Sequence, residues 1–233
     1  MKRRDFIKNT SAGTLAFMLP FSSSAFASDK KLRVAQVGLG SMGLNDLKDI
    51  ASHKSVEIVA LCDVDTSKLN AVKASYPNAK TFTDYREMFK SIGNGIDAVV
   101  VSTPDHAHAP VALRAMEMNK NVYCQKPLTH YISESRKMDA VAQQKKLVTQ
   151  MGIQVHSFYD YKLATILIQG GIIGKVRKVI AWSPKVWGYD GHAPEGSDPV
   201  PGGLDWNLWL GTAKERPYKE GVYHPANWRK CID

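Results

Sequence analysis

Cysteine is scarce in this chain of 233 residues, which contains only Cys62, Cys124 and Cys231. A small, odd number of cysteines argues against a disulfide framework, and their spacing does not match a zinc site. Cys62 and Cys124 stand at the ends of apolar runs, where cysteine behaves as a small buried hydrophobic residue. We therefore expect neither a disulfide framework nor a metal site.

Long hydrophobic runs and long runs of one charge are also missing. The apolar stretch Thr14–Phe21 is too short to span a bilayer, so stable membrane insertion is not expected. The densest basic patch is Lys175–Lys178, and no nucleic-acid-binding motif accompanies it. Nucleic acid is therefore excluded as an expected partner.

The first 27 residues are typical of a signal peptide. A basic segment, Lys2–Lys8, precedes the apolar Thr14–Phe21, and Ala25–Ala27 forms a small-x-small cleavage site. The pair Arg3-Arg4 resembles a twin-arginine signal, although a Sec signal with two chance arginines stays open. Removal of this leader takes away four basic residues and one acidic residue, which lowers the net charge from +9 to about +6. We expect export by the twin-arginine machinery to the periplasm, with a mature chain beginning near Ser28.

Strand-like and helix-like segments alternate over residues 28–153. Strands are predicted at 32–37, 56–62, 80–82, 98–102, 121–124 and 147–151, and helices near 44–52, 66–75, 84–92, 107–118 and 133–145. Ser133 is the expected cap of the last helix. Continuously apolar strands separated by helices indicate a parallel sheet that is covered on both faces. We therefore predict an α/β fold, with a Rossmann doubly wound parallel sheet.

The pattern changes after residue 155, so residues 154–233 are assigned to a second domain. Tyr159–Leu167 keeps helical spacing, and Val176–Trp182 reads as a strand. From Ser183 onward the chain is rich in proline, glycine and tryptophan and is predicted to be irregular. One helix and one strand cannot bury a sheet face. The prediction is therefore an incomplete α+β domain, with exposed apolar residues around Val176–Trp182.

A glycine-rich turn directly follows the first predicted strand. Gly38 permits a sharp turn, Gly40 lets the backbone approach phosphates, and Gly43 allows close packing of helix and strand. Asp63 falls twenty residues beyond Gly43, at the end of the second strand, where a carboxylate binds ribose hydroxyls and favours NAD over NADP. Asp65 is a weaker alternative for that role. The predicted cofactor loop comprises Gly38, Leu39, Gly40, Ser41, Met42 and Gly43.

Two further strand ends carry candidate site residues, because ligands of such sheets bind at the carboxyl ends of the strands. After the fourth strand, Thr103 and Pro104 are expected to line the nicotinamide end of a cofactor. His106 and His108 follow as candidate polar contacts, with a helix cap or a satisfied surface histidine as the open alternative. The fifth strand ends in Gln125-Lys126-Pro127. Gln125 and Lys126 are predicted to contact the cofactor, and Lys126 is also suited to polarise a substrate oxygen.

These motifs, in this order and spacing, resemble the Gfo/Idh/MocA oxidoreductases. The resemblance rests on Gly38–Gly43, Cys62–Asp65, Thr103–His108, Cys124–Leu128 and the later stretches Pro199–Gly211 and Tyr223–Arg229. It implies NAD as cofactor, and hydride transfer between a sugar or polyol and the nicotinamide.

The resemblance also makes Lys126 the catalytic lysine of a Glu-Lys-Pro motif and Gln125 a departure from that motif. The family's later motif, an aspartate and a histidine that serves as general base, has no match before Asp233. From this we expect an N-terminal part of a longer enzyme, inactive by itself. Oligomer formation is left to the full-length form. Two alternatives stay open: a glycosidase of glycoside hydrolase family 109, which does not consume NAD, and an inactive NAD-binding fragment.

Overall fold

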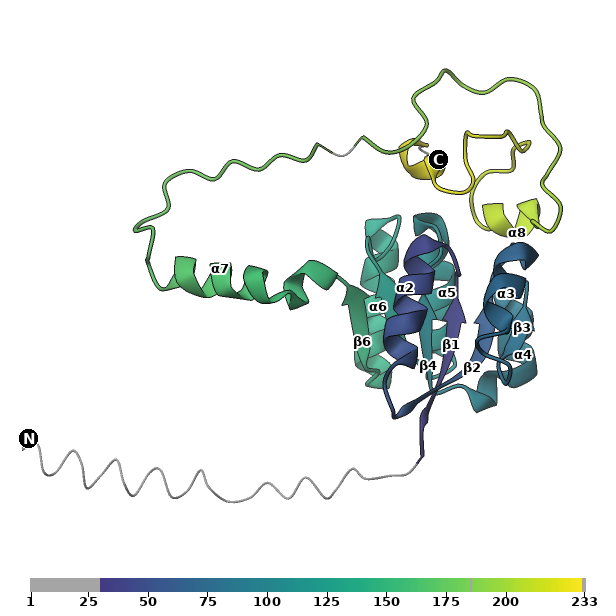
Figure 1. Cartoon of the computed structure of the whole chain (residues 1–233), viewed down its shortest axis with the longest axis horizontal. Helices are drawn as coiled ribbons and strands as arrows, with labels where there is room; N and C mark the ends of the chain where they lie inside the picture. The colour runs from purple at the N-terminus through teal and green to yellow at the C-terminus, as the bar shows by residue number, and fades with distance from the viewer. Residues whose placement is uncertain (1–29, 185, 232–233) are drawn as a thin grey trace, which may run out of the picture. The chain divides into compact units, whose positions relative to one another are not determined.

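A computed structural model describes residues 30–184 and 186–231, and its centre is a six-stranded parallel sheet (Figure 1). The strand order is β3-β2-β1-β4-β5-β6, so the chain runs outward from β1 in both directions. The strands are β1 (Leu32–Val37), β2 (Val56–Cys62), β3 (Lys80–Phe82), β4 (Ala98–Val101), β5 (Asn121–Gln125) and β6 (Thr149–Gly152). The predicted doubly wound parallel sheet is confirmed.

Helices cover both faces of this sheet because the central strands are apolar on both sides. They are α2 (Ser41–Ala51), α3 (Thr66–Lys73), α4 (Tyr85–Ile92), α5 (Asp105–Glu117) and α6 (Ile132–Lys145). Val34 and Val100 pack with Leu47 of α2 and Leu69 of α3 on one face. Alternate strand residues such as Val99 and Val101 pack on the other face with the buried residues Met88, Phe89, Ala112, Met116 and Met138 of α4, α5 and α6.

All three cysteines are free thiols, as the sequence predicts. Cys62 and Cys124 are buried at the ends of β2 and β5. Burial raises the pKa of the Cys62 thiol, and it raises the pKa of Cys124 to about 12. Because the thiolate is the reactive form, these two side chains are inert packing elements.

The segment after β6 differs from the prediction in one respect. The helix is confirmed as α7 (Tyr159–Gln169), but the strand predicted at Val176–Trp182 is wrong: these residues form neither helix nor strand (Figure 1). No described strand pairs with them, and a lone strand has no partner for its backbone groups. Their apolar side chains are exposed as expected, with Trp182 83% exposed.

Helix α6 begins differently from the prediction, because its N-cap is Tyr131 and Ser133 lies inside the helix. The Glu134 carboxylate accepts from the backbone N–H of Tyr131 at 3.0 Å, which satisfies a backbone donor at the helix start.

No helix within residues 30–184 and 186–231 has the length and hydrophobicity to cross a membrane.

The last part of the chain, residues 204–231, folds as a small aromatic cluster. It contains the short helix α8 (Trp206–Leu210), and its buried members are Leu204, Trp209, Leu210, Tyr218, Val222 and Tyr223. The segment is joined to the loop after β2 by backbone hydrogen bonds, from Thr66 N–H to the Gly203 carbonyl at 2.9 Å and from Asp205 N–H to the Val64 carbonyl at 2.9 Å. These contacts hold the cluster beside the carboxyl end of the sheet.

Candidate cofactor-binding site

A cavity of about 1000 Å³ opens at the carboxyl ends of β1, β2, β4 and β5. Strand tips, the turn after β1 and the chain's last residues all contribute to its walls. Its lining includes Gly38, Gly40, Ser41, Met42, Gly43, Asp63, Lys68, Thr103, Pro104, Asp105, His108, Gln125, Lys126, His224 and Arg229. Most residues that the sequence nominated thus meet in one cavity; Leu39 and His106 are not among its lining residues.

The three glycines of the turn serve different physical roles. Gly38 has φ +91°, and a Cβ there would lie 2.5 Å from the Ser102 carbonyl oxygen. A Cβ on Gly43 would lie 2.2 Å from the Gly38 carbonyl oxygen. By contrast, a Cβ on Gly40 would meet nothing within 4 Å. The protein itself therefore requires Gly38 and Gly43, whereas Gly40 borders open space in the cavity.

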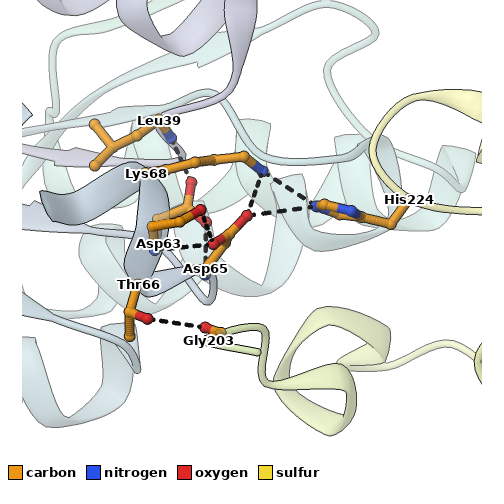
Figure 2. Close-up of polar contacts among 8 residues, drawn as sticks. Leu39, Asp63, Asp65, Thr66, Lys68, Gly203 and His224 are labelled. Carbon is orange, nitrogen blue, oxygen red and sulfur yellow. Dashed lines mark hydrogen bonds and ion pairs between the residues drawn. The ribbon is translucent and has the colours of Figure 1, made fainter. Parts of the chain in front are cut away.

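Asp63 lies at the tip of β2 with both carboxylate oxygens held by backbone groups. The Leu39 N–H donates to Oδ2 at 2.7 Å, and the Asp65 N–H donates to Oδ1 at 2.9 Å (Figure 2). Burial raises the pKa of this carboxyl, and the nearby Lys68 and these two hydrogen bonds oppose the rise. Leu39, itself buried, thus serves the site through its backbone, by fixing the acid that faces the cavity.

Asp65, the alternative ribose ligand, is committed to helix α3. Its Oδ1 accepts from the Ser67 N–H at 3.0 Å and from the Ser67 hydroxyl, so it caps the helix. Its Oδ2 faces Lys68, with 3.5 Å between the oxygen and Nζ. Asp63 is therefore the better placed of the two acids to meet a ribose.

Lys68 and His224 form a contact that the sequence did not reveal. Lys68 Nζ lies 3.2 Å from His224 Nε2, and His224 Nε2 lies 3.9 Å from Asp65 Oδ2 (Figure 2). Burial lowers the pKa of His224, and the Lys68 charge lowers it further, against the opposite effect of Asp65 and Asp63. The neutral ring thus accepts a hydrogen bond from Lys68, which ties the last segment of the chain to the ribose end of the cavity.

Beyond the tip of β4, the Thr103 hydroxyl lacks a described hydrogen-bond partner, and two histidines already contact backbone carbonyl groups. Thr103 Oγ1 is buried and has no hydrogen-bond partner among the described residues. His108 is buried, with Nδ1 2.6 Å from the Pro127 carbonyl and Nε2 2.9 Å from the Thr103 carbonyl. His106 Nε2 lies 2.9 Å from the Trp209 carbonyl, and the ring packs against Trp209. Both histidines therefore hold chain segments together; they are satisfied as in the open alternative, but His108 is buried and does not lie at the surface.

Lys126 is exposed at the tip of β5 and lines the cavity. It precedes Pro127 through a cis peptide bond. Asp105, at the start of α5, shares this end of the cavity; burial raises its pKa, while the nearby side chains of His108, Arg229 and Lys126 oppose the rise. Two cationic side chains and one carboxylate thus surround the space beyond the strand tips.

The tryptophans divide between packing and the cavity wall. Trp206 stacks on Trp209 with ring centroids 4.8 Å apart, and its indole N–H donates to the Arg216 carbonyl. The guanidinium of Arg229 lies 4.5 Å from the ring centroid of Trp228 and 5.7 Å from that of Trp187. Trp187, Trp209 and Trp228 line the cavity, and Trp206 belongs to the aromatic cluster.

These features fit an extended dinucleotide. The open space at Gly40 and the start of α2 suit a pyrophosphate, since a helix N-terminus carries partial positive charge. Asp63 suits a ribose, and the unpartnered Thr103 Oγ1 offers a hydrogen bond to a polar ligand group further along the cavity. Fold and site together define a dinucleotide-binding α/β protein.

The family follows from a direct comparison. The family model of Gfo/Idh/MocA, described as an oxidoreductase family with an NAD-binding Rossmann fold, matches residues 32–153. The chain belongs to this family, and NAD is its cofactor.

Two groups of relatives are similar to the chain. A glycosyl hydrolase family 109 protein of Stenotrophomonas maltophilia is 37% identical over 134 residues, which cover 54% of this chain and 29% of that protein. An inositol 2-dehydrogenase of Salmonella typhimurium is 30% identical over 147 residues, covering 62% of this chain and 43% of that protein. The chain therefore spans less than half the length of these curated relatives.

Solved structures show the same fold. The myo-inositol 2-dehydrogenase of Lactobacillus plantarum matches with a TM-score of 0.59 and 29% identity, covering 63% of this chain and 43% of that one. The scyllo-inositol dehydrogenase of Lactobacillus casei with bound NAD(H) and scyllo-inositol matches with a TM-score of 0.57 and 26% identity, covering 62% and 43%.

Sequence reasoning missed the site residues that come from distant parts of the chain. Lys68 has no motif of its own, and neither its contact with His224 nor the place of Arg229 in the cavity could be read from spacing. The stretch Tyr223–Arg229 did carry a signal, because it formed part of the family resemblance. Its role in the cavity wall appears only when the chain is folded.

The open space at Gly40 yields the first prediction. Gly40→Val should abolish NAD binding, because the side chain would fill the space beside the turn, while the unfolding temperature should change little. Binding is measured by calorimetry and unfolding by circular dichroism. Gly202→Val is the matched control, because a Cβ there also meets nothing within 4 Å and the residue is not among those that line the cavity. Normal NAD affinity in Gly40→Val would contradict this assignment.

The His224 contact yields a pH prediction. Because the folded pKa of His224 lies below its ordinary value of about 6.5, the unfolded chain binds the proton more readily. The stabilisation is present above pH 6.5 and is lost as pH falls below it. Tryptophan fluorescence during thermal unfolding at pH 7.5 and 5.5 should show a larger loss of stability in the wild type than in His224→Gln. Equal losses would show that His224 does not titrate in this way.

Proposed function

We propose that the protein is an NAD-dependent oxidoreductase acting on a carbinol carbon of a sugar or polyol. The observation that carries the proposal is that Lys126 shares one cavity with the Gly40 turn and Asp63. A cation at the strand tip then faces the far end of a dinucleotide that is anchored by its phosphates and ribose. The inositol dehydrogenases among the relatives support a polyol or sugar as substrate.

NAD, when bound, supplies the group that accepts a hydride from the substrate carbon. The protein's part begins with Lys126, whose ammonium group can donate a hydrogen bond to the substrate oxygen and stabilise negative charge that develops there. Arg229 and Asp105 border the same space and can bind further hydroxyl groups. The indole ring of Trp228 beside Arg229 provides an apolar surface for a sugar ring.

Oxidation of a carbinol also requires that the hydroxyl proton leaves, so a positioned base is needed. The two histidines that line this cavity are already engaged: His108 with two carbonyl oxygens and His224 with Lys68. His106, outside the lining, contacts the Trp209 carbonyl. We infer that this chain by itself binds NAD and turns over poorly or not at all.

A glycosidase is the second candidate, because a glycosyl hydrolase family 109 protein is 37% identical over the matched residues. Such a reaction would use the same cavity and return the hydride to the substrate, so that NAD would not be consumed. Net NADH formation therefore separates the two candidates.

We also propose that the protein is exported, on the basis of the leader in residues 1–27. These residues lie outside those that the structure describes. The proposal therefore rests on the sequence, which carries the arginine pair, the apolar segment and the cleavage site. A protein that binds a dinucleotide benefits from folding around it in the cytoplasm, and the twin-arginine route accepts folded cargo.

The activity prediction concerns Lys126. We expect at most slow NADH formation with an inositol or hexose, and that rate should be lowered at least about tenfold in Lys126→Ala with little change in NAD affinity, because the lysine acts on the substrate oxygen. NADH absorbance and NAD calorimetry provide the two measurements. Lys137→Ala is the control, since that lysine is 61% exposed and lies outside the cavity.

Three other outcomes of this assay are informative. Release of an aglycone from a glycoside without net NADH would favour the glycosidase. NAD binding with no turnover on any substrate would favour a binding role. Fast turnover would show that one of the engaged histidines, or another group, serves as base.

The export prediction concerns Arg3 and Arg4. Replacing both with lysine keeps the charge but should trap the precursor in the cytoplasm, because the twin-arginine machinery reads the arginine pair itself. Fractionation followed by mass analysis checks the location and should find Ser28 at the N-terminus of the exported wild type. Continued export of the double-lysine variant would indicate the Sec route.

A further inference from the structure

A buried polar network connects the glycine turn, helix α2 and the tips of β4 and β5. At its centre is Asp46, which lies on α2 and is only 6% exposed. The Ser102 hydroxyl donates to Asp46 Oδ2 at 2.7 Å. Gln36 in turn donates from Nε2 to Ser102 Oγ at 3.2 Å and to the Gly38 carbonyl at 2.9 Å. The network therefore reaches the first glycine of the cofactor turn.

Gln125 joins this network from the tip of β5. Its amide nitrogen Nε2 donates to both Asp46 oxygens, each at 2.9 Å. Its amide oxygen Oε1 accepts from the backbone N–H of Lys126 at 3.3 Å. Gln125 is 4% exposed, so the contacts form away from water. The side chain of Gln125 thus links Asp46 to the backbone of the lysine.

The packing leaves this amide little freedom. Gly152 of β6 also lies against this amide: a Cβ there would stand 2.8 Å from both Cδ and Nε2 of Gln125. Asp46 of α2 and the backbone at Gly152 together restrict the orientation of the amide. Since Asp46 accepts every hydrogen bond described for its carboxylate, the NH₂ end of Gln125 must face it.

This geometry fits a glutamine at position 125 and disfavours a glutamate there. A glutamate at position 125 would place a carboxylate oxygen against Asp46 at hydrogen-bond distance in a buried site. Two like charges so close are strongly unfavourable unless one of them is neutralised. Asp46 therefore selects a neutral donor at position 125.

We infer that Asp46 and Gln125 form a pair that positions Lys126. The negative charge of the pair lies on α2, at Asp46, and not at position 125 beside the lysine. The pair couples the backbone of Lys126 to the same helix that begins at the cofactor turn. Asp46 and Gln125 are positioning residues, since they act through Lys126. The functional meaning of the pair rests on the proposed role of that lysine.

The test is a reciprocal exchange. Gln125→Glu places two carboxylates against one another and should lower the unfolding temperature by roughly 5 °C or more. Asp46→Asn keeps one acceptor oxygen for the Gln125 amide but replaces the other oxygen with an NH₂ donor, so it should lower the unfolding temperature by a smaller amount. The double variant Asp46→Asn with Gln125→Glu restores a donor facing an acceptor, with the charge moved to position 125. It should recover at least half of the loss.

Hydrogen exchange followed by mass spectrometry separates positioning from general stability. In each single variant the peptide covering residues 125–130 should exchange about tenfold faster, while peptides from β1 and β4 change much less. In the double variant the exchange of residues 125–130 should return toward the wild-type rate. A purely structural role would instead raise exchange uniformly over the sheet.

The exposed pair Gln143 and Asp139 on α6 supplies the matched control. There too a glutamine Nε2 donates to both oxygens of an aspartate, at 3.0 and 2.9 Å, but in contact with water. Gln143→Glu should shift the unfolding temperature by less than about 2 °C, because solvent screens the repulsion.

Three results would overturn the inference: singles that destabilise without faster exchange at residues 125–130, a double variant no better than the sum of its singles, or a control as damaging as Gln125→Glu. If Gln125→Glu does not fold, folding of the double variant is itself the rescue, and its failure to fold overturns the pair. None of these readouts requires turnover. A wild type that binds NAD without turnover would therefore favour a binding role over the proposed function, and the pairing would still stand or fall by exchange alone.

Discussion

The close approach of backbone at the turn after β1 is the constraint on which the rest of the site depends. Gly38 lies against the Ser102 carbonyl, and Gly43 lies against the Gly38 carbonyl, at distances that no Cβ would permit. This contact draws the first turn of α2 onto the tips of β1 and β4. The space beside Gly40 is open, and Asp46, one turn further along α2, lies within hydrogen-bond distance of Ser102 and Gln125.

Polar groups at the carboxyl end of the sheet mainly hold the tips of the strands in place. Asp63 receives two backbone N–H groups, His108 lies between two carbonyl oxygens, and Gln125 bridges Asp46 and Lys126. Burial makes each of these interactions costly to leave unmade, which favours a single arrangement of the tips. Lys126 and Thr103 remain available to a ligand because neighbouring side chains make the hydrogen bonds that hold the strand tips in place.

The last residues of the chain complete the cavity wall, although they lie outside the part that matches the family model. Backbone pairing of Gly203 and Asp205 with the loop after β2 holds the aromatic cluster beside the sheet. From there His224 reaches Lys68 at the ribose end, and Arg229 reaches the end where Lys126 lies. Both ends of the proposed dinucleotide site are therefore bordered by one segment.

The sequence by itself determined the sheet, its helices and the glycine turn, because apolar period and glycine spacing are local properties of the chain. It also indicated Asp63 and Lys126, since residues at the ends of parallel strands meet at one edge. It failed at Val176–Trp182, where apolar β-branched residues found no partner strand among the described residues. Only the tertiary structure decided that His106 and His108 hydrogen-bond to distant carbonyl groups and that Gln125 donates to Asp46. These contacts join residues 19 to 103 positions apart in the sequence.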